Sequence, residues 1–206
     1  LPARTWVQDP PSVGPMRVTH RDAKVRQPSL SRLYRAISYG TDEGREAHAL
    51  DVAVEILGGS ETSRLYRALV EEQRIAVSAG ASSNTGGLGG GSVSVYATPV
   101  EGVSLERLEA AVDEVVAAFL REGPSEAELA RAKSSMSAAA IYSRDSQESL
   151  ANIYGASLAE GESIDDVVNW ARDIEAVTRE DTLATARRTL DIDASVTGWL
   201  MPEREE

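Results

Sequence analysis

The residues that could hold a catalytic metal are few and poorly spaced. The chain of 206 residues contains two histidines, His20 and His48, and no cysteine. On a helix, a second ligand for His48 would stand one turn away, where the chain has Gly44 and Val52, and neither side chain coordinates a metal. The sequence therefore predicts no metal ligands in this chain.

Patterns for nucleophilic or acid–base catalysis are also missing. There is no G-x-S-x-G motif, and no serine stands three residues before Lys24 or Lys133. The adjacent carboxylates Glu71–Glu72 and Asp165–Asp166 are typical of solvated helix faces rather than of acid–base pairs. We therefore predict no catalytic residues and no cofactor for this chain, and no activity for the chain alone.

A glycine-rich segment, Gly86 to Gly91, invites comparison with phosphate-binding loops. Such loops lead into a helix and usually carry a lysine after the last glycine. Here the following residues alternate like a strand, and the segment contains no cation. A flexible hairpin tip is the favoured interpretation, with ligand binding as the weaker alternative.

The stretch from Gly58 to Ala81 is the structural centre of the expected fold. Leu65 and Leu69 share one face of a predicted helix over 63–74. From residue 75 the pattern alternates, so that Ile75, Val77, Ala79 and Ala81 share one face of a strand. Capping boxes are expected at Ser125-x-x-Glu128 and Thr178-x-x-Asp181, and caps at Thr41-Asp42 and Ser104. The other expected elements are strands at 16–25, 31–39, 92–98 and 195–201, and helices at 42–57, 105–122, 125–140, 147–158, 164–174 and 182–190.

The order of these elements predicts an α+β domain. Strands, one buried helix and a hairpin come first, then a run of helices and a final strand, which favours an antiparallel sheet covered on one face by helices. We expect one domain over 16–206. Residues 1–15 contain four prolines and are interpreted as the remnant of an interdomain linker. No apolar run approaches the ~20 residues of a membrane span, and the start lacks the apolar core of a signal peptide.

The net charge of −12 argues against nucleic acids and anionic membranes as partners, because both would require a basic surface. It does not indicate a substrate.

Several stretches, in the same order along the chain, resemble one family. They are PSVGPMRVTHRDAKVRQPSLSRLYRA, GGSETSRLYRALVEEQRIAVSAGA, SEAELARAKSSMSAA, IYSRDSQESLANIYG and IEAVTREDTLATARRTLD. Together they are similar to the repeated domain of the pitrilysin (insulinase, mitochondrial-processing-peptidase-like) zinc metallopeptidases. The resemblance extends over nearly the whole chain and implies the metallopeptidase domain fold.

The resemblance also implies a division of labour. Family subunits have two domains of like fold: the first carries zinc on H-x-x-E-H, and the second closes a chamber over the peptide. This chain resembles the second, so zinc is expected in an N-terminal domain of the same polypeptide. Many family members hold substrate with an Arg and a Tyr at the positions of Val70 and Val77. Neither valine can donate a hydrogen bond, so only the location in the substrate chamber is carried over.

Two functions remain open. The first is the non-catalytic C-terminal domain of a zinc endopeptidase, which forms the chamber wall, contacts a homologous partner subunit in a dimer and faces peptide substrates. The alternative is an inactive structural or assembly subunit of the same fold. The bacterial periplasm is the expected location, with the cytoplasm as the alternative.

Overall fold

The computed structural model describes residues 14–41 and 44–203, with side chains from residue 46 onward in the second range. Its centre is a five-stranded sheet in the order β1-β5-β2-β4-β3. The strands are β1 Met16–Asp22, β2 Ser29–Ala36, β3 Ala76–Asn84, β4 Gly91–Pro99 and β5 Ser195–Pro202. The predicted α+β class is confirmed, and so is the hairpin of β3 and β4.

The pairing of β1 differs from the expected antiparallel sheet. β2 pairs antiparallel with both β4 and β5, and β3 pairs antiparallel with β4, but β1 runs parallel to β5. The cause is connectivity. A short turn joins β1 to β2, so these two strands run in opposite directions, and β5 inserts between them. Because β5 is antiparallel to β2, it has to be parallel to β1.

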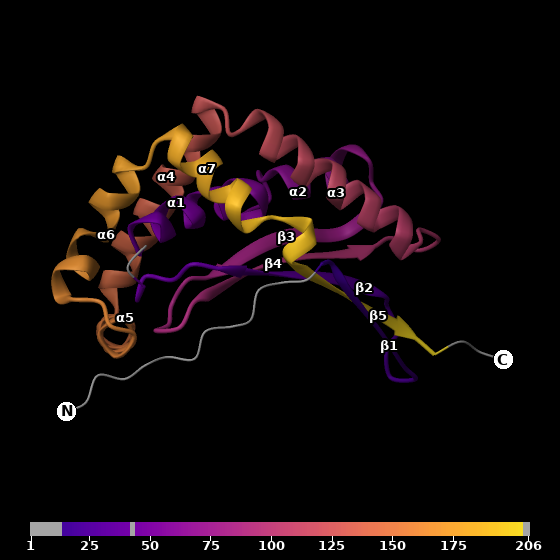
Figure 1. Ribbon diagram of the computed structural model, residues 1–206, viewed down its shortest axis with the longest axis horizontal. Coiled ribbons are helices and arrows are strands. Elements are labelled where there is room, and N and C mark those ends of the chain that lie inside the picture. Colours follow the sequence, from indigo (N-terminus) through magenta and orange to yellow (C-terminus); the bar gives the residue numbers. More distant parts are fainter. Residues whose placement is uncertain (1–13, 42–43, 204–206) are drawn as a thin grey trace.

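Helices cover one face of this sheet (Figure 1). The α-helices are α1 Gly44–Val54, α2 Arg64–Tyr66, α3 Leu105–Glu122, α4 Glu126–Tyr142, α5 Gln147–Ala159, α6 Ile164–Ala176 and α7 Arg179–Thr189. Wider π-helical turns form η1 (Glu55–Gly59) and η2 (Arg67–Glu72), and 3-10 turns form η3 (Ser143–Asp145) and η4 (Ile192–Ala194).

The sequence signals for helix starts are confirmed wherever the structure describes them. Ser125 with Glu128 and Thr178 with Asp181 both form complete capping boxes, and Ser104 caps α3. Asp42, part of the expected cap of α1, lies outside the described residues. The caps at Ser104, Ser125 and Thr178 satisfy backbone N–H groups that the first helical turn leaves without partners.

Tight packing around the 58–81 stretch explains its glycines. The predicted helix runs directly into the predicted strand, and Arg74, with a φ of 53°, provides the change of direction. At Gly58 a Cβ atom would collide with the backbone of β3 at Gly80 and Ala81. The helical turn η1, which contains Gly58 and precedes the predicted helix, is therefore in direct backbone contact with β3, which no larger residue permits.

The prediction that Val77 shares a face of the strand with Ile75, Ala79 and Ala81 is wrong. A β-bulge between Ala76 and Ser78 shifts the alternation, so that Ile75, Ala79 and Ala81 are buried while Val77 is 51% exposed. A bulge adds one residue to the strand without a partner opposite, and the residue parity changes across it. Strict period-two reasoning cannot detect such an insertion.

The glycine-rich connection between β3 and β4 is packed against the end of β2. Ser38 Oγ donates to Gly87 O over 2.7 Å, and Tyr39 N donates to Thr85 O over 2.9 Å. A Cβ atom on Gly91 would lie 2.7 Å from Ile37 O. The glycines therefore allow close approach to the 37–40 segment, whereas the sequence had indicated only a turn.

Candidate functional site

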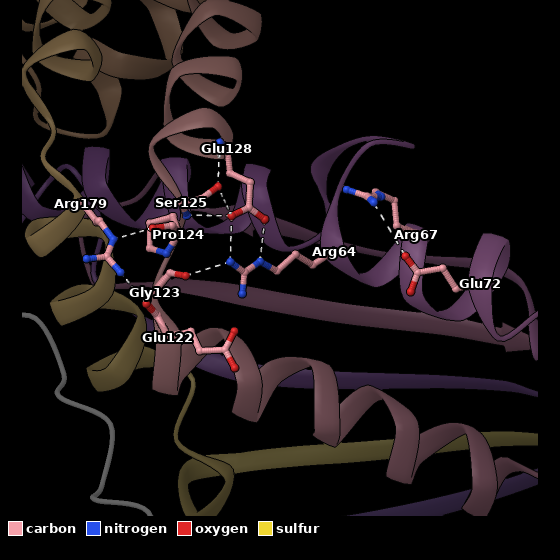
Figure 2. A network of polar contacts seen from close by, with 9 residues as sticks. All are labelled: Arg64, Arg67, Glu72, Glu122, Gly123, Pro124, Ser125, Glu128 and Arg179. Atoms are coloured by element: carbon pink, nitrogen blue, oxygen red, sulfur yellow. Dashed lines mark hydrogen bonds and ion pairs between the residues drawn. The ribbon is translucent and has the colours of Figure 1, made fainter.

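The helix–strand unit over 58–81 is anchored by Arg64. Its guanidinium donates through Nε and Nη2 to the two carboxylate oxygens of Glu128, over 2.7 and 2.8 Å, and through Nη2 to Gly123 O over 2.8 Å (Figure 2). The hydrogen bond from Arg64, with those from Ser125, lowers the pKa of Glu128 to about 2, and the same pair raises the pKa of Arg64. This ionic fork ties α2 to the start of α4.

The turn between α3 and α4 is held from its other side as well. Arg179, at the start of α7, donates through Nε to Pro124 O and through Nη2 to Glu122 O, both over 2.6 Å (Figure 2). Arg67 and Glu72, in contrast, form an exposed pair at 3.8 Å (Figure 2), which contributes little stability. The rigid part of the unit is therefore its N-terminal end.

Val70 and Val77 lie on the two halves of this unit. Val70, in η2, is partly buried and packs against the core. Val77 is exposed at the bulge near the start of β3. Both side chains are hydrocarbon, so this region can offer a ligand an apolar contact but no hydrogen bond from these two side chains.

The face of the sheet opposite the helices exposes apolar side chains. On β2 the side chains of Leu30, Arg32 and Tyr34 are buried on the helix side, so alternation places Leu33 on the other face. The strand register continues this face in a row from Met16 through Val196 to Leu33. We call it the open face; its exposed apolar residues are Met16, Val18, Leu33, Tyr96, Val196 and Leu200, which are between 37% and 56% exposed.

A buried ionic cluster fixes the strands from the helix side. Arg32, only 1% exposed, binds Glu109 through Nη2 over 2.7 Å and also pairs with Asp113, while its Nε donates to Thr197 over 2.8 Å. Glu109 accepts as well from Trp199 Nε1, over 2.9 Å, and from Arg17. Residues of β1, β2 and β5 thus converge on one carboxylate of α3, which ties these three strands to the helix layer.

The two histidines lie in different layers of the domain. His20 lies on β1 opposite Leu200 in the register, on the open face. His48 lies on α1, in the helix layer, with its ring edge-on to Tyr39 at 4.8 Å between centroids. Within residues 14–41 and 44–203, no group of three or more His, Cys, Asp or Glu side chains is arranged to hold a metal.

Two large hollows and a smaller one lie in the helix layer. One, of about 910 Å³, lies between α1, α6 and α7, and its mixed lining includes Glu46, Asp166, Arg172 and Asp181. The other large hollow, of about 500 Å³, lies between α4, α5 and α6, and its lining includes Tyr39 and Trp170. Neither contains Val70 or Val77, so these hollows are separate from the positions expected to face a substrate.

Beneath the second hollow runs a chain of hydrogen bonds that the sequence did not reveal. Trp170 Nε1 donates to Tyr39 Oη over 3.1 Å, and Tyr39 donates to Asp51 over 2.6 Å. Ser83 and Thr85 also donate to Asp51, over 2.7 and 3.1 Å. Burial raises the pKa values of Asp51 and Tyr39. Asp51 is the one carboxylate in an otherwise apolar stretch of α1, which is the signal that could have identified it.

The domain thus has an α+β fold with one open sheet face. The sequence profile described as "Peptidase M16 inactive domain" matches residues 2–136, well over half of the chain. The chain therefore belongs to the inactive-domain family of the M16 (pitrilysin) peptidases. A search of curated protein sequences gives no match.

Solved structures share this fold at low sequence identity. A protease from Helicobacter pylori matches with a TM-score of 0.87 and 17% identity, over 97% of this chain and 47% of its own. An inactive peptidase domain from Bordetella parapertussis matches with a TM-score of 0.77 and 19% identity, over 91% of this chain and 96% of its own. A chain of Complex III2 from Candida albicans matches with a TM-score of 0.74 and 16% identity, over 91% of this chain and 46% of its own. This chain thus spans about half the length of the first and third of these structures.

Among the described residues, no helix combines the length and the apolar character that a membrane crossing requires.

Proposed function

We propose that this chain is the non-catalytic C-terminal domain of a zinc-dependent endopeptidase, and that its open face forms part of the wall of the substrate chamber. The observation that carries the proposal is the exposed apolar row on the sheet, in a domain of the M16 inactive family. An exposed apolar surface of this kind is characteristic of a surface that meets another protein or a ligand. Peptides offer the apolar side chains and backbone that would contact it.

In this proposal the zinc belongs to an N-terminal domain of the same polypeptide. That domain would supply the metal and the activated water, and the present domain would supply enclosure and positioning. Val70 and Val77 are not part of the open face; beside and on the edge strand β3, they would border the chamber and offer apolar contact only. The hydrogen-bonding Arg and Tyr would then come from a homologous partner subunit, with which the open face and its surroundings would form a dimer.

The first test is the upstream sequence. About two hundred codons before Leu1, one family domain in length, would encode an H-x-x-E-H helix if the proposal is correct. A similar fold without that motif would contradict it. The encoded full-length protein, expressed with any homologous partner encoded beside it, should cleave unfolded peptide substrates, and a zinc chelator should abolish the cleavage.

A matched pair of variants in that full-length protein tests the wall itself. Leu33, on the open face, and Val168, on α6, are exposed to similar extents, 48% and 51%. Leu33→Glu should reduce peptide cleavage about tenfold or more, because a carboxylate would have to lose its water of hydration against an apolar substrate. Val168→Glu should leave cleavage unchanged. Equal activity of both variants would show that the open face does not line the chamber.

The alternative is an inactive structural or assembly subunit. It is favoured by the likeness to a chain of Complex III2, and it predicts that the full-length protein cleaves nothing, with or without a chelator. In that case Leu33→Glu should weaken assembly with a partner chain, as measured by size-exclusion chromatography with light scattering.

For the location we propose the bacterial periplasm, with the cytoplasm as the alternative. The proposal is supported by the similar fold of the periplasmic protease PqqL from Escherichia coli, at a TM-score of 0.67 and 20% identity over 93% of this chain and 21% of that one. Osmotic-shock fractionation of cells that express the full-length gene distinguishes the two compartments.

A further inference from the structure

The helix α5 rests on the domain without burying any residue completely. It lies beside the connection between β3 and β4, at the end of the molecule where α4 and α6 also meet (Figure 1). Between these three helices remains the hollow of about 500 Å³. Close packing normally excludes such a volume from a helical layer, so the hollow requires an explanation of its own.

The walls of this hollow are largely apolar. Met136 and Ala140 of α4, Ile153 of α5, and Val167 and Trp170 of α6 contribute to the lining. Its volume falls within the range of small-molecule sites, which are concave, mostly apolar and furnished with a few polar groups. A small molecule with a hydrocarbon or aromatic part would replace water here favourably.

Besides hydroxyl groups, the lining of the hollow contains three charged side chains, two of them acidic. Glu160 and Glu162 are part of its lining, and Arg144 is the one cationic side chain in that lining. The Glu160 carboxylate lies close to Gly86, since a Cβ atom there would be 2.5 Å from its Oε2 atom. Among the side chains that the structure describes, those of residues 14–41 and 46–203, no lysine or arginine forms an ion pair with Glu160 or Glu162.

A third carboxyl group lies below the base of the hollow. The Oη atom of Tyr39 accepts from Trp170 and donates to Asp51, so its hydrogen bonds point toward a third carboxyl group. The chain as a whole carries a net charge of −12. An anion would therefore meet repulsion both locally and at long range, whereas a cation would be attracted.

We propose that the hollow between α4, α5 and α6 binds a small organic cation with an apolar body. The ammonium or guanidinium group lies near Glu160 and Glu162, and the hydrocarbon or aromatic part packs against Trp170 and the apolar walls. The ring of Trp170 adds a favourable surface for the cationic end. This site lies in the helix layer and does not depend on the proposed chamber on the open face.

The test compares three probes of similar size and different charge: 4-phenylbutylamine, 4-phenylbutan-1-ol and 4-phenylbutyrate. Binding is measured by ¹H–¹⁵N NMR on the chain, which has three tryptophans. The indole signal of Trp170, assigned with Trp170→Phe, reports on the hollow. The amine should shift this signal and bind about tenfold more tightly than the alcohol, and the butyrate should bind more weakly than both.

Variants separate charge from shape. Glu160→Gln with Glu162→Gln should bring the affinity for the amine down to that of the alcohol, because only the charge attraction is removed. Glu148→Gln, on α5 and outside the lining, is the control and should change nothing. Ala140→Phe should fill the hollow and abolish binding of all three probes.

The proposal is overturned if the three probes bind equally, if the Trp170 signal does not move at millimolar amine, or if the double glutamine variant retains the preference for the amine. The glutamine variants replace rim carboxylates by amides of the same shape. They therefore keep the test decisive even if Ala140→Phe fails to fold.

Discussion

Glu128→Gln is the sharpest test of how the helix layer holds the 58–81 unit. In the folded chain the pKa of Glu128 falls from an ordinary value of 4.5 to about 2. At about 1.4 kcal/mol per unit of pKa, this difference corresponds to at most about 3.5 kcal/mol of folding stability. The side chain is 19% exposed, and the amide keeps part of the hydrogen bonding. We therefore expect a loss of about 2 kcal/mol at pH 7.

The pH dependence gives the more demanding measurement. Because folding depresses the pKa of Glu128, its contribution is fully present above about pH 4.5 and disappears as the pH falls toward 2. Urea denaturation of both proteins at several pH values should show a gap that is constant near neutrality and closes below pH 4.5.

The control is Glu126→Gln, which removes a charge from the same helical turn without touching Arg64. It should lose only the few tenths of a kcal/mol that a charge near a helix N-terminus contributes. Equal stability of Glu128→Gln and the parent chain at pH 7, or parallel pH curves down to pH 2, would refute the role assigned to the Arg64–Glu128 fork.

Two further predictions concern glycine and buried charge, and chemical denaturation checks both. Gly155→Ala should stabilise the chain by about 0.5–1 kcal/mol, because Gly155 is inside α5 with open space around it. Gly58→Ala should instead destabilise the chain by about 2 kcal/mol or more, because the added methyl group would collide with β3. Arg32→Ala should cost about 3–5 kcal/mol, because it leaves Glu109 buried without its main partner, and a loss below 1 kcal/mol would contradict that account.

The sequence was most informative where local chemistry decides the structure. The capping residues Ser104 and Ser125 located two helix starts correctly, because a cap involves only neighbouring backbone groups. The capping box at Thr178 is also present, but α7 begins at Arg179, three residues before the predicted start at 182. The long hydrophobic period around Leu50 likewise predicted a buried helix, and Leu50 is 0% exposed. The α+β class followed from the order of such elements.

Long-range relations could not be derived in the same way. The insertion of β5 between β1 and β2 depends on pairing between residues far apart in the chain, for which no local pattern exists. The bulge that exposes Val77 is a property of two strands together. Buried Arg32 did leave a trace, since it shares the parity of Leu30 and Tyr34 on β2. The parity of Arg32 does not identify its partners on α3, Glu109 and Asp113.

The hydrogen-bonded Asp51 and the hollow beside α5 were missed for a similar reason. A lone acidic residue on an apolar helix indicates a buried polar contact, but it does not identify Tyr39 as the partner. The hollow depends on how three helices pack against one another, and the sequence of each helix alone does not determine that packing.

The position of β5 between β1 and β2 has a consequence for the order in which the domain can fold. During synthesis, β1 and β2 emerge early. The strand that pairs with both of them, β5, consists of residues 195–202 and emerges late. Until those residues leave the ribosome, β1 has no neighbour in the sheet and β2 has an unpaired edge, which is a site for aggregation. A chain that stops after α7 would thus lose two strands rather than one. Completion of the sheet should be a late and slow step of folding, because it closes a loop of nearly the whole domain.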